Sequence, residues 1–257
     1  MKRGWWSQRP LLACYAPLAD PECPTNILEI YAGNGVDIVE VGIPSTDPYM
    51  DGPAVADSMR RVLQSGDPQR LICSQIESQA TFAARCRLVL MGYHDMSFRW
   101  AEDLARRNLV HGLIMADATA STEPRDLAAW LASFGMERVG FVNARMSDGM
   151  IERARRAGGY VMLQAHDGPT GVRSHLDSSN GDKLKQLRNS GIDLPVLLGF
   201  GIGTAEAAAA AMNMGADGVV VGSACVAAAR QGAESLGHLV RSVRSAIDSA
   251  VCVAAAG

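Results

Sequence analysis

The most informative chemical group in this sequence is a glutamate within an apolar run. Residues 37–43 read Asp-Ile-Val-Glu-Val-Gly-Ile, a pattern typical of a buried β-strand. Because side chains alternate along a strand, Val39, Val41 and Ile43 share one face and Glu40 lies on the other. If the apolar face packs against helices, Glu40 points inward, where burial raises the pKa of its carboxyl and suits it to general acid/base chemistry. A buried glutamate in a structural ion pair is the alternative.

A second carboxylate, Asp51, follows in the loop after this strand. It precedes Gly52-Pro53, and Asp before Gly-Pro is a natural turn and helix-entry residue. Spacing alone leaves both interpretations of Asp51 open, as a functional carboxylate or as a turn residue.

Two glycine-rich segments are candidates for binding an anion. Residues 199–203 read Gly-Phe-Gly-Ile-Gly ahead of Thr204, and residues 221–224 read Val-Gly-Ser-Ala ahead of a helix-compatible stretch. Glycines let backbone N–H groups approach an anion, and a helix start adds partial positive charge. A tight turn explains either segment alone, but two at neighbouring strand ends favour a phosphate site. Residues 168–171 (Gly-Pro-Thr-Gly) are a candidate third wall or lid.

Other catalytic chemistries are less well supported. His94-Asp95 and His166-Asp167 could converge as a metal site or an imidazole base, but they lack a tight ligand spacing such as H-x-x-x-H. We therefore expect no metal and no cofactor. The lysines are Lys2, Lys183 and Lys185, and none falls in an expected strand, so the sequence does not favour a Schiff base.

Short apolar runs alternate with longer amphipathic stretches, which indicates successive βα units. We expect strands over residues 11–17, 37–43, 87–93, 112–117, 138–143, 160–165, 195–201 and 217–222. We expect helices over residues 25–34, 53–64, 68–84, 98–108, 122–134, 147–157, 181–190, 204–214 and 235–252. Eight such units favour a closed (β/α)8 TIM barrel, as a single α/β domain over residues 1–257, with a doubly wound open sheet as the alternative. In such barrels the active site lies at the carboxyl ends of the strands.

Composition is that of an ordinary globular chain. Of 257 residues 48% are hydrophobic, and the formal net charge of −3 gives no electrostatic footprint for nucleic acid or an anionic membrane. No apolar run approaches the roughly 20 residues that span a bilayer. Arg9-Pro10 leaves no apolar signal segment ahead of Cys14, so we expect a cytoplasmic protein. The six cysteines form no C-x-x-C pair, and we expect buried, reduced thiols.

Residues 40–53 read Glu-Val-Gly-Ile-Pro-Ser-Thr-Asp-Pro-Tyr-Met-Asp-Gly-Pro. This segment resembles the E-L-G-x-P-F-S-D-P-x-A-D-G-P signature of tryptophan synthase α chains. The chain is identified as a member of that family, because further matches run along its length. They are Asp20-Pro21, Met91-Gly92-Tyr93, Asp117, Gly168-Pro169-Thr170-Gly171, Gly199-Phe200-Gly201-Ile202, Gly215-Ala216-Asp217-Gly218 and Val221-Gly222-Ser223-Ala224.

The resemblance implies retro-aldol cleavage of indole-3-glycerol phosphate to indole and glyceraldehyde 3-phosphate. It implies that Glu40 is the acid/base, that Asp51 engages the indole N–H, and that Thr170 bonds that aspartate when the lid closes. It also implies a tryptophan synthase β subunit as partner, in an α2β2 complex. The phosphate-binding positions that it implies are Gly171, Gly201, Gly222 and Ser223, and we add Tyr15, Tyr93 and Phe200 as substrate-binding residues.

Several positions depart from the family pattern near the expected indole pocket and partner face. The departures are Ser45 for an aromatic residue, Tyr93-His94-Asp95 for Y-x-N, Asn143-Ala144-Arg145 for a P-T-T-like segment, Met162 for a tyrosine, and Ala165-His166-Asp167 at the start of the lid. They keep two alternatives open. One is a stand-alone lyase that releases free indole for secondary metabolism, and the other is a non-catalytic regulatory subunit.

Overall fold

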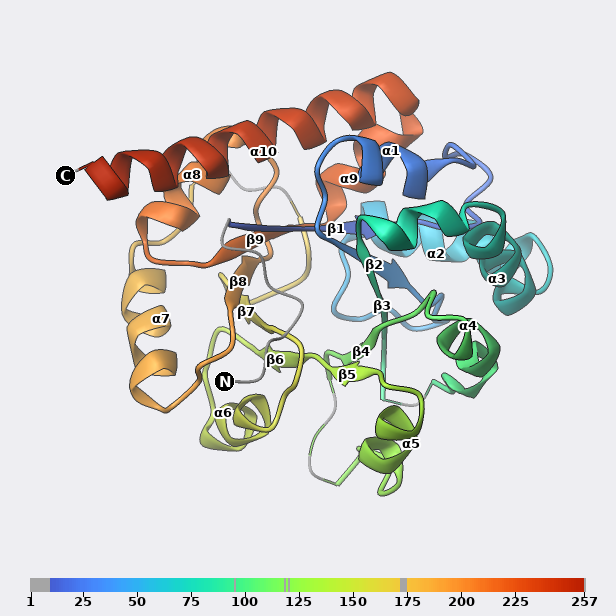
Figure 1. The fold of residues 1–257 in the computed structure, drawn as a ribbon, viewed down its shortest axis with the longest axis horizontal. Helices are drawn as coiled ribbons and strands as arrows, with labels where there is room; N and C mark the ends of the chain where they lie inside the picture. The colour runs from blue at the N-terminus through green and yellow to red at the C-terminus, as the bar shows by residue number, and fades with distance from the viewer. Residues whose placement is uncertain (1–9, 95, 118, 120, 172–174, 257) are drawn as a thin grey trace.

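The computed structural model describes residues 10–94, 96–117, 119, 121–171 and 175–256. Its strands are parallel and follow one another around a single sheet in the order β5-β4-β3-β2-β1-β9-β8-β7-β6, with helices on the outside (Figure 1). The first strand pairs with both the second and the last. The strands are β1 (Leu11–Ala16), β2 (Ile38–Gly42), β3 (Arg87–Gly92), β4 (Gly112–Met115), β5 (Glu137–Arg138), β6 (Gly140–Val142), β7 (Val161–Gln164), β8 (Val196–Gly199) and β9 (Gly218–Val221). This pairing confirms the (β/α)8 barrel and contradicts the open doubly wound sheet, in which the terminal strands would not meet.

The one strand expected over residues 138–143 is divided in the structure. β5 pairs with β4, whereas β6 pairs with β7. The change of partner falls at one peptide, because Val139 N–H donates to Leu113 O while Gly140 N–H donates to Tyr160 O. The fifth barrel strand thus closes the ring as two short pieces.

Helices follow the strands at nearly all the expected places. They are α1 (Ile27–Gly33), α2 (Pro53–Gln64), α3 (Pro68–Ser78), α4 (Glu102–Arg106), α5 (Leu127–Ser133), α6 (Asp148–Arg155), α7 (Ser179–Asn189), α8 (Ala205–Asn213), α9 (Ser223–Arg230) and α10 (Ala233–Ala256), with 3-10 turns η1 (Ala80–Ala84) and η2 (Arg99–Ala101). The stretches 68–84 and 98–108 each divide into an α-helix and a 3-10 turn. The stretch 122–134 shortens to α5, because Thr122 bonds with Thr119 in a turn instead of starting the helix.

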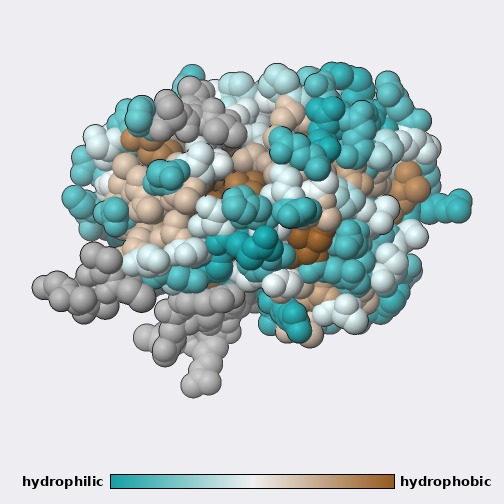
Figure 2. All heavy atoms as spheres, turned by 90° about the horizontal axis from the view of Figure 1, so that it is seen from above, coloured by the Kyte–Doolittle hydropathy of each residue, from teal (hydrophilic) through white to brown (hydrophobic). Residues whose placement is uncertain are grey.

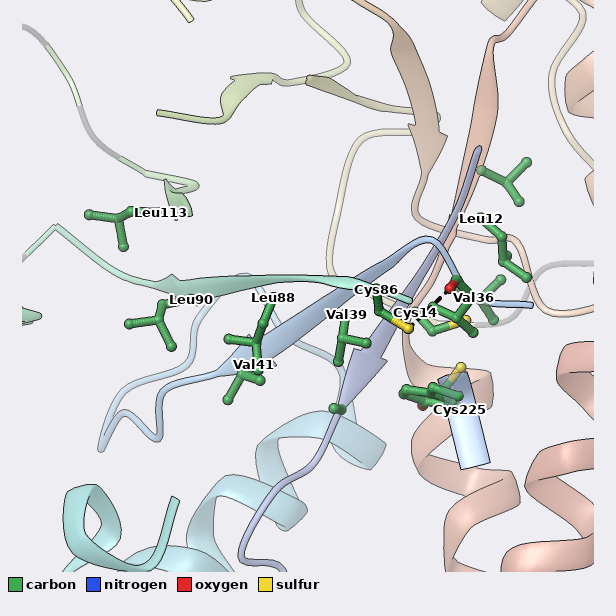
Figure 3. Packing of buried hydrophobic residues seen from close by; sticks show 14 of the residues in the cluster. Leu12, Cys14, Val36, Val39, Val41, Cys86, Leu88, Leu90, Leu113 and Cys225 are labelled. Carbon is green, nitrogen blue, oxygen red and sulfur yellow. Dashed lines mark hydrogen bonds between the residues drawn. The ribbon is translucent and has the colours of Figure 1, made fainter. Parts of the chain in front are cut away.

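Two separate layers of apolar side chains confirm the strand parity on which the inward position of Glu40 depends. Val39 and Val41 pack in the layer between strands and helices, with Leu12, Leu88 and Leu90 from neighbouring strands (Figure 3). Ile38 belongs instead to the cluster inside the barrel. Glu40, two residues further along β2, shares the face of Ile38 and is fully buried.

The described cysteines are free thiols. Cys14, Cys86 and Cys225 are buried in the outer layer, as expected (Figure 3), whereas Cys23 and Cys73 are only partly buried, contrary to the expectation, and pack at the edge of that layer. Among the described residues, no helix has the length and apolar character needed to cross a membrane. On the face shown in Figure 2, hydrophilic residues surround areas of hydrophobic ones.

Candidate active site

A pocket opens at the carboxyl ends of the barrel strands. All ten site residues expected from the sequence line it, although they come from six different strands and the segments that follow them. They are Glu40, Asp51, Tyr15, Tyr93, Thr170, Gly171, Phe200, Gly201, Gly222 and Ser223.

Glu40 lies at the base of this pocket on β2. Its Oε1 accepts a hydrogen bond from the hydroxyl of Tyr160, the residue directly before β7. Its Oε2 is buried and has no hydrogen-bond partner among the described residues. Desolvation by burial raises the pKa of Glu40 to about 7, although the bond from Tyr160 opposes the shift. A carboxyl with this pKa exchanges protons readily near neutral pH.

Asp51 faces the same pocket from the loop between β2 and α2. Tyr93 donates its hydroxyl to Asp51 Oδ2 at 2.8 Å, and Thr170 donates to Oδ1 at 3.4 Å. Burial raises the pKa of the Asp51 carboxyl, and the two hydroxyl bonds act in the opposite direction. Each carboxylate oxygen of Asp51 therefore accepts a hydrogen bond from a side-chain hydroxyl.

The segment 168–171, the candidate lid that carries Thr170, is joined to the Asp51 loop through backbone contacts. Thr170 N–H donates to Met50 O at 3.1 Å, and Gly52 N–H donates to Thr170 Oγ1 at 2.8 Å. A Cβ atom at Gly52 would lie 2.0 Å from the carbonyl oxygen of Thr170. Only glycine allows this approach.

The other end of the pocket presents backbone groups to a ligand. Phe200 and Gly201 both have positive φ, of 68° and 101°, and Thr204 caps the start of α8 by accepting from Ala207 N–H. Gly222 precedes the first residue of α9, Ser223. The N-terminus of α9 therefore lies at this end, where an anion is favoured. No Lys, Arg or His is among the described residues that line the pocket.

Apolar side chains form the wall between the carboxylates and the glycine-rich end. This wall consists of Met50, Met91, Phe141, Met162 and Phe200. A flat aromatic group would contact thioethers and ring edges there, which are favourable neighbours for an arene.

Several residues of the site were not anticipated from the sequence. Tyr160 begins an expected strand and shares the inward parity of Met162, but no local signal pairs it with Glu40. Tyr49 and Asp117 also meet, since Tyr49 donates its hydroxyl to Asp117 Oδ2 at 2.7 Å.

Within the part of the chain that the structure describes, the alternative constellations do not assemble. Among the described residues, no group of three or more His, Cys, Asp or Glu side chains could hold a metal ion. His94 Nδ1 lies 2.7 Å from Asp117 Oδ2, and Asp167 pairs with Arg145. Asp95 lies outside the described residues. Lys183 contacts Ala165 O and Asn180 Oδ1 from α7 and does not line the pocket.

Comparison with known proteins agrees with this geometry. The family model described as tryptophan synthase alpha chain matches residues 6–250. The tryptophan synthase alpha chain of Geobacter sulfurreducens is 32% identical over 256 residues, covering 95% of this chain and 94% of the relative. That of Nitratidesulfovibrio vulgaris is 37% identical over 224 residues, covering 84% and 85%. Among solved structures, tryptophan synthase of Mycobacterium tuberculosis superposes with a TM-score of 0.79 at 28% identity, covering 93% of each chain.

Proposed function

The chain belongs to the tryptophan synthase alpha chain family, and on this premise we propose that Glu40 and Asp51 carry out the cleavage of indole-3-glycerol phosphate to indole and glyceraldehyde 3-phosphate. The enzyme is a carbon–carbon lyase of the aldolase type that serves tryptophan biosynthesis. The observation that carries the assignment of residues is the burial of Glu40, with a pKa of about 7, in the same pocket as Asp51.

The reaction breaks the bond between indole C3 and the first carbon of the glycerol chain. C3 must gain a proton. The hydroxyl on that first glycerol carbon must lose a proton, because this carbon becomes the aldehyde. Glu40 Oε2 has no hydrogen-bond partner among the described residues, so this oxygen is the one that exchanges protons with substrate. A carboxyl with a pKa of about 7 serves as both acid and base in successive steps.

Asp51 accepts the indole N–H in this proposal. Protonation at C3 leaves positive charge on the ring nitrogen, and a carboxylate bound to that N–H stabilises it. Tyr93 and Thr170 hold the two oxygens of Asp51, so the carboxylate is oriented before the charge develops. The carboxylate charge of Asp51 is needed only once the ring nitrogen becomes positive, so loss of this charge should lower kcat more than it changes KM.

The phosphate of the substrate is assigned to the glycine-rich end. Gly171, Gly201 and Gly222 offer backbone N–H groups, Ser223 offers a hydroxyl, and the start of α9 adds partial positive charge. Tyr15 and Phe200 complete the walls. The indole ring then lies against the methionine and phenylalanine wall, between the two carboxylates and the phosphate end.

We also propose that a tryptophan synthase β subunit is the partner, in an α2β2 complex. The support is the family and the likeness to the tryptophan synthase structure of Mycobacterium tuberculosis. The experiment is an indole-release assay on the purified chain, with and without a β subunit. Activation by the β subunit is the expected result. High turnover that the β subunit does not change would contradict the partnership, and no indole under either condition would contradict the activity.

A further inference from the structure

A cluster beside the pocket ties together the loops that follow three neighbouring strands. The buried carboxylate of Asp117, just after β4, is its centre. Asp117 Oδ1 accepts from His94 N–H at 2.7 Å, and His94 Nδ1 lies 2.7 Å from Oδ2. Oδ2 also accepts the hydroxyl of Tyr49 at 2.7 Å. Asp117 therefore joins the loop after β2, through Tyr49, to the loop after β3, through His94.

The loop that Tyr49 anchors is the one that carries Asp51. The Tyr49 ring lies 5.2 Å from the ring of Tyr93, centroid to centroid. The Tyr93 hydroxyl in turn accepts from Met50 N–H at 3.3 Å and donates to Asp51 Oδ2. Tyr49 thus lies one contact away from the donor that orients Asp51.

Burial does not account for the position of Tyr49, because its side chain is 60% exposed. An exposed tyrosine gains little from apolar contact, whereas a hydroxyl bond to a nearly buried carboxylate is a directional contact that holds the ring in place. Without that bond, the Asp51 loop would keep its contacts with Tyr93 and Thr170 but lose the link from Tyr49 to Asp117.

We propose that Tyr49 and His94 are positioning residues for the cleavage reaction, which act through Asp117 to hold the Asp51 loop in its working geometry. The inference rests on the proposed function of Asp51. It gives a role to His94, which occupies the variable middle position of the Tyr93-His94-Asp95 segment, and to Tyr49, which no motif singled out.

The test uses the whole chain and the variant Tyr49→Phe, which keeps the ring beside Tyr93 and removes only the hydroxyl. We expect kcat for indole release to fall about tenfold, the order expected for one hydrogen bond to a charged group, while KM changes less than about twofold. Hydrogen–deuterium exchange should rise in residues 45–52. His94→Ala should produce both effects. Ser65→Ala is the matched control, because it removes an exposed hydroxyl bond at the end of α2, to Arg61 O, and should change neither quantity.

A second arm separates positioning of Asp51 from a general structural effect. In an Asp51→Asn background, measured in single turnover with enzyme in excess, Tyr49→Phe should cause no further loss, because the group it positions is already disabled. An additive tenfold loss there would overturn the proposal. So would an unchanged kcat or unchanged exchange of residues 45–52 in Tyr49→Phe. If the wild-type chain releases no indole, the proposed function fails, whereas the exchange experiment still reports on the anchor.

Discussion

Tyr160 reaches across the inside of the barrel, from the start of β7 to β2, and donates its hydroxyl to Glu40 Oε1. The bond fixes one carboxyl oxygen and leaves Oε2 without a hydrogen-bond partner among the described residues. It also lowers the pKa of Glu40, against the larger effect of desolvation, which raises the value to about 7. The proton affinity of Glu40 is therefore set by two opposing effects, burial and the hydrogen bond from the Tyr160 hydroxyl.

The first prediction concerns this balance. Tyr160→Phe removes the interaction that lowers the pKa of Glu40, so the apparent pKa that Glu40 contributes to the pH dependence of kcat/KM should move above about 7. A pH profile from pH 5 to 10 with saturating and limiting substrate checks this. A profile that keeps its midpoint, or moves to lower pH, would show that Tyr160 does not set the proton affinity of Glu40.

The second prediction links the same pKa to stability. Between pH 4.5 and about 7, Glu40 keeps its proton in the folded chain, whereas the unfolded chain has released it. Stabilisation from this proton is complete below pH 4.5 and is lost as pH rises to about 7. Glu40→Gln keeps a neutral side chain at every pH, so its free energy of unfolding relative to wild type should increase by up to about 3 kcal/mol between pH 4.5 and 8.

Urea denaturation at the two pH values measures this difference. Asp182→Asn, at an exposed carboxylate on α7, is the matched control and should show little pH dependence relative to wild type. A constant difference between Glu40→Gln and wild type across this range would argue that Glu40 is ionised throughout.

The third prediction concerns the joint between the lid and the Asp51 loop. Gly52→Ala places a Cβ atom 2.0 Å from the backbone oxygen of Thr170, so the lid must move away and Thr170 must release Asp51. We expect kcat/KM to fall on the order of tenfold to a hundredfold. Gly149→Ala, where a Cβ atom meets nothing within 4 Å, should leave activity unchanged. Equal activity of the two variants would mean that the lid contact has no part in the reaction.

The fourth prediction addresses the phosphate end. A Cβ atom at Gly222 meets nothing within 4 Å, so an aspartate fits and its main effect is charge. Gly222→Asp should raise KM at least about tenfold by placing a carboxylate beside the substrate phosphate, and the uncharged Gly222→Asn should raise it much less. The same KM in both variants would show that the substrate phosphate does not bind at this end of the pocket.

The sequence predicted the elements well because their signals are local. Alternation in residues 37–43 places Glu40 inside the barrel, and the capping threonine at Thr204 marks the start of α8. The division of the fifth strand at Val139 was not predicted, because it depends on two different neighbouring strands. The same reason applies to Tyr160, which is 120 residues from Glu40, and to Asp117, which meets Tyr49 and His94 only in the folded barrel.

The central claim is that Glu40 transfers protons during cleavage of indole-3-glycerol phosphate while Asp51 holds the indole N–H. The most direct measurement compares indole release with substrate affinity, by calorimetry, in Glu40→Gln and Asp51→Asn. The account predicts that Glu40→Gln lowers kcat by at least about a hundredfold while it still binds the substrate with nearly wild-type affinity, and that Asp51→Asn also loses most cleavage. Near-normal cleavage by Glu40→Gln would contradict the account.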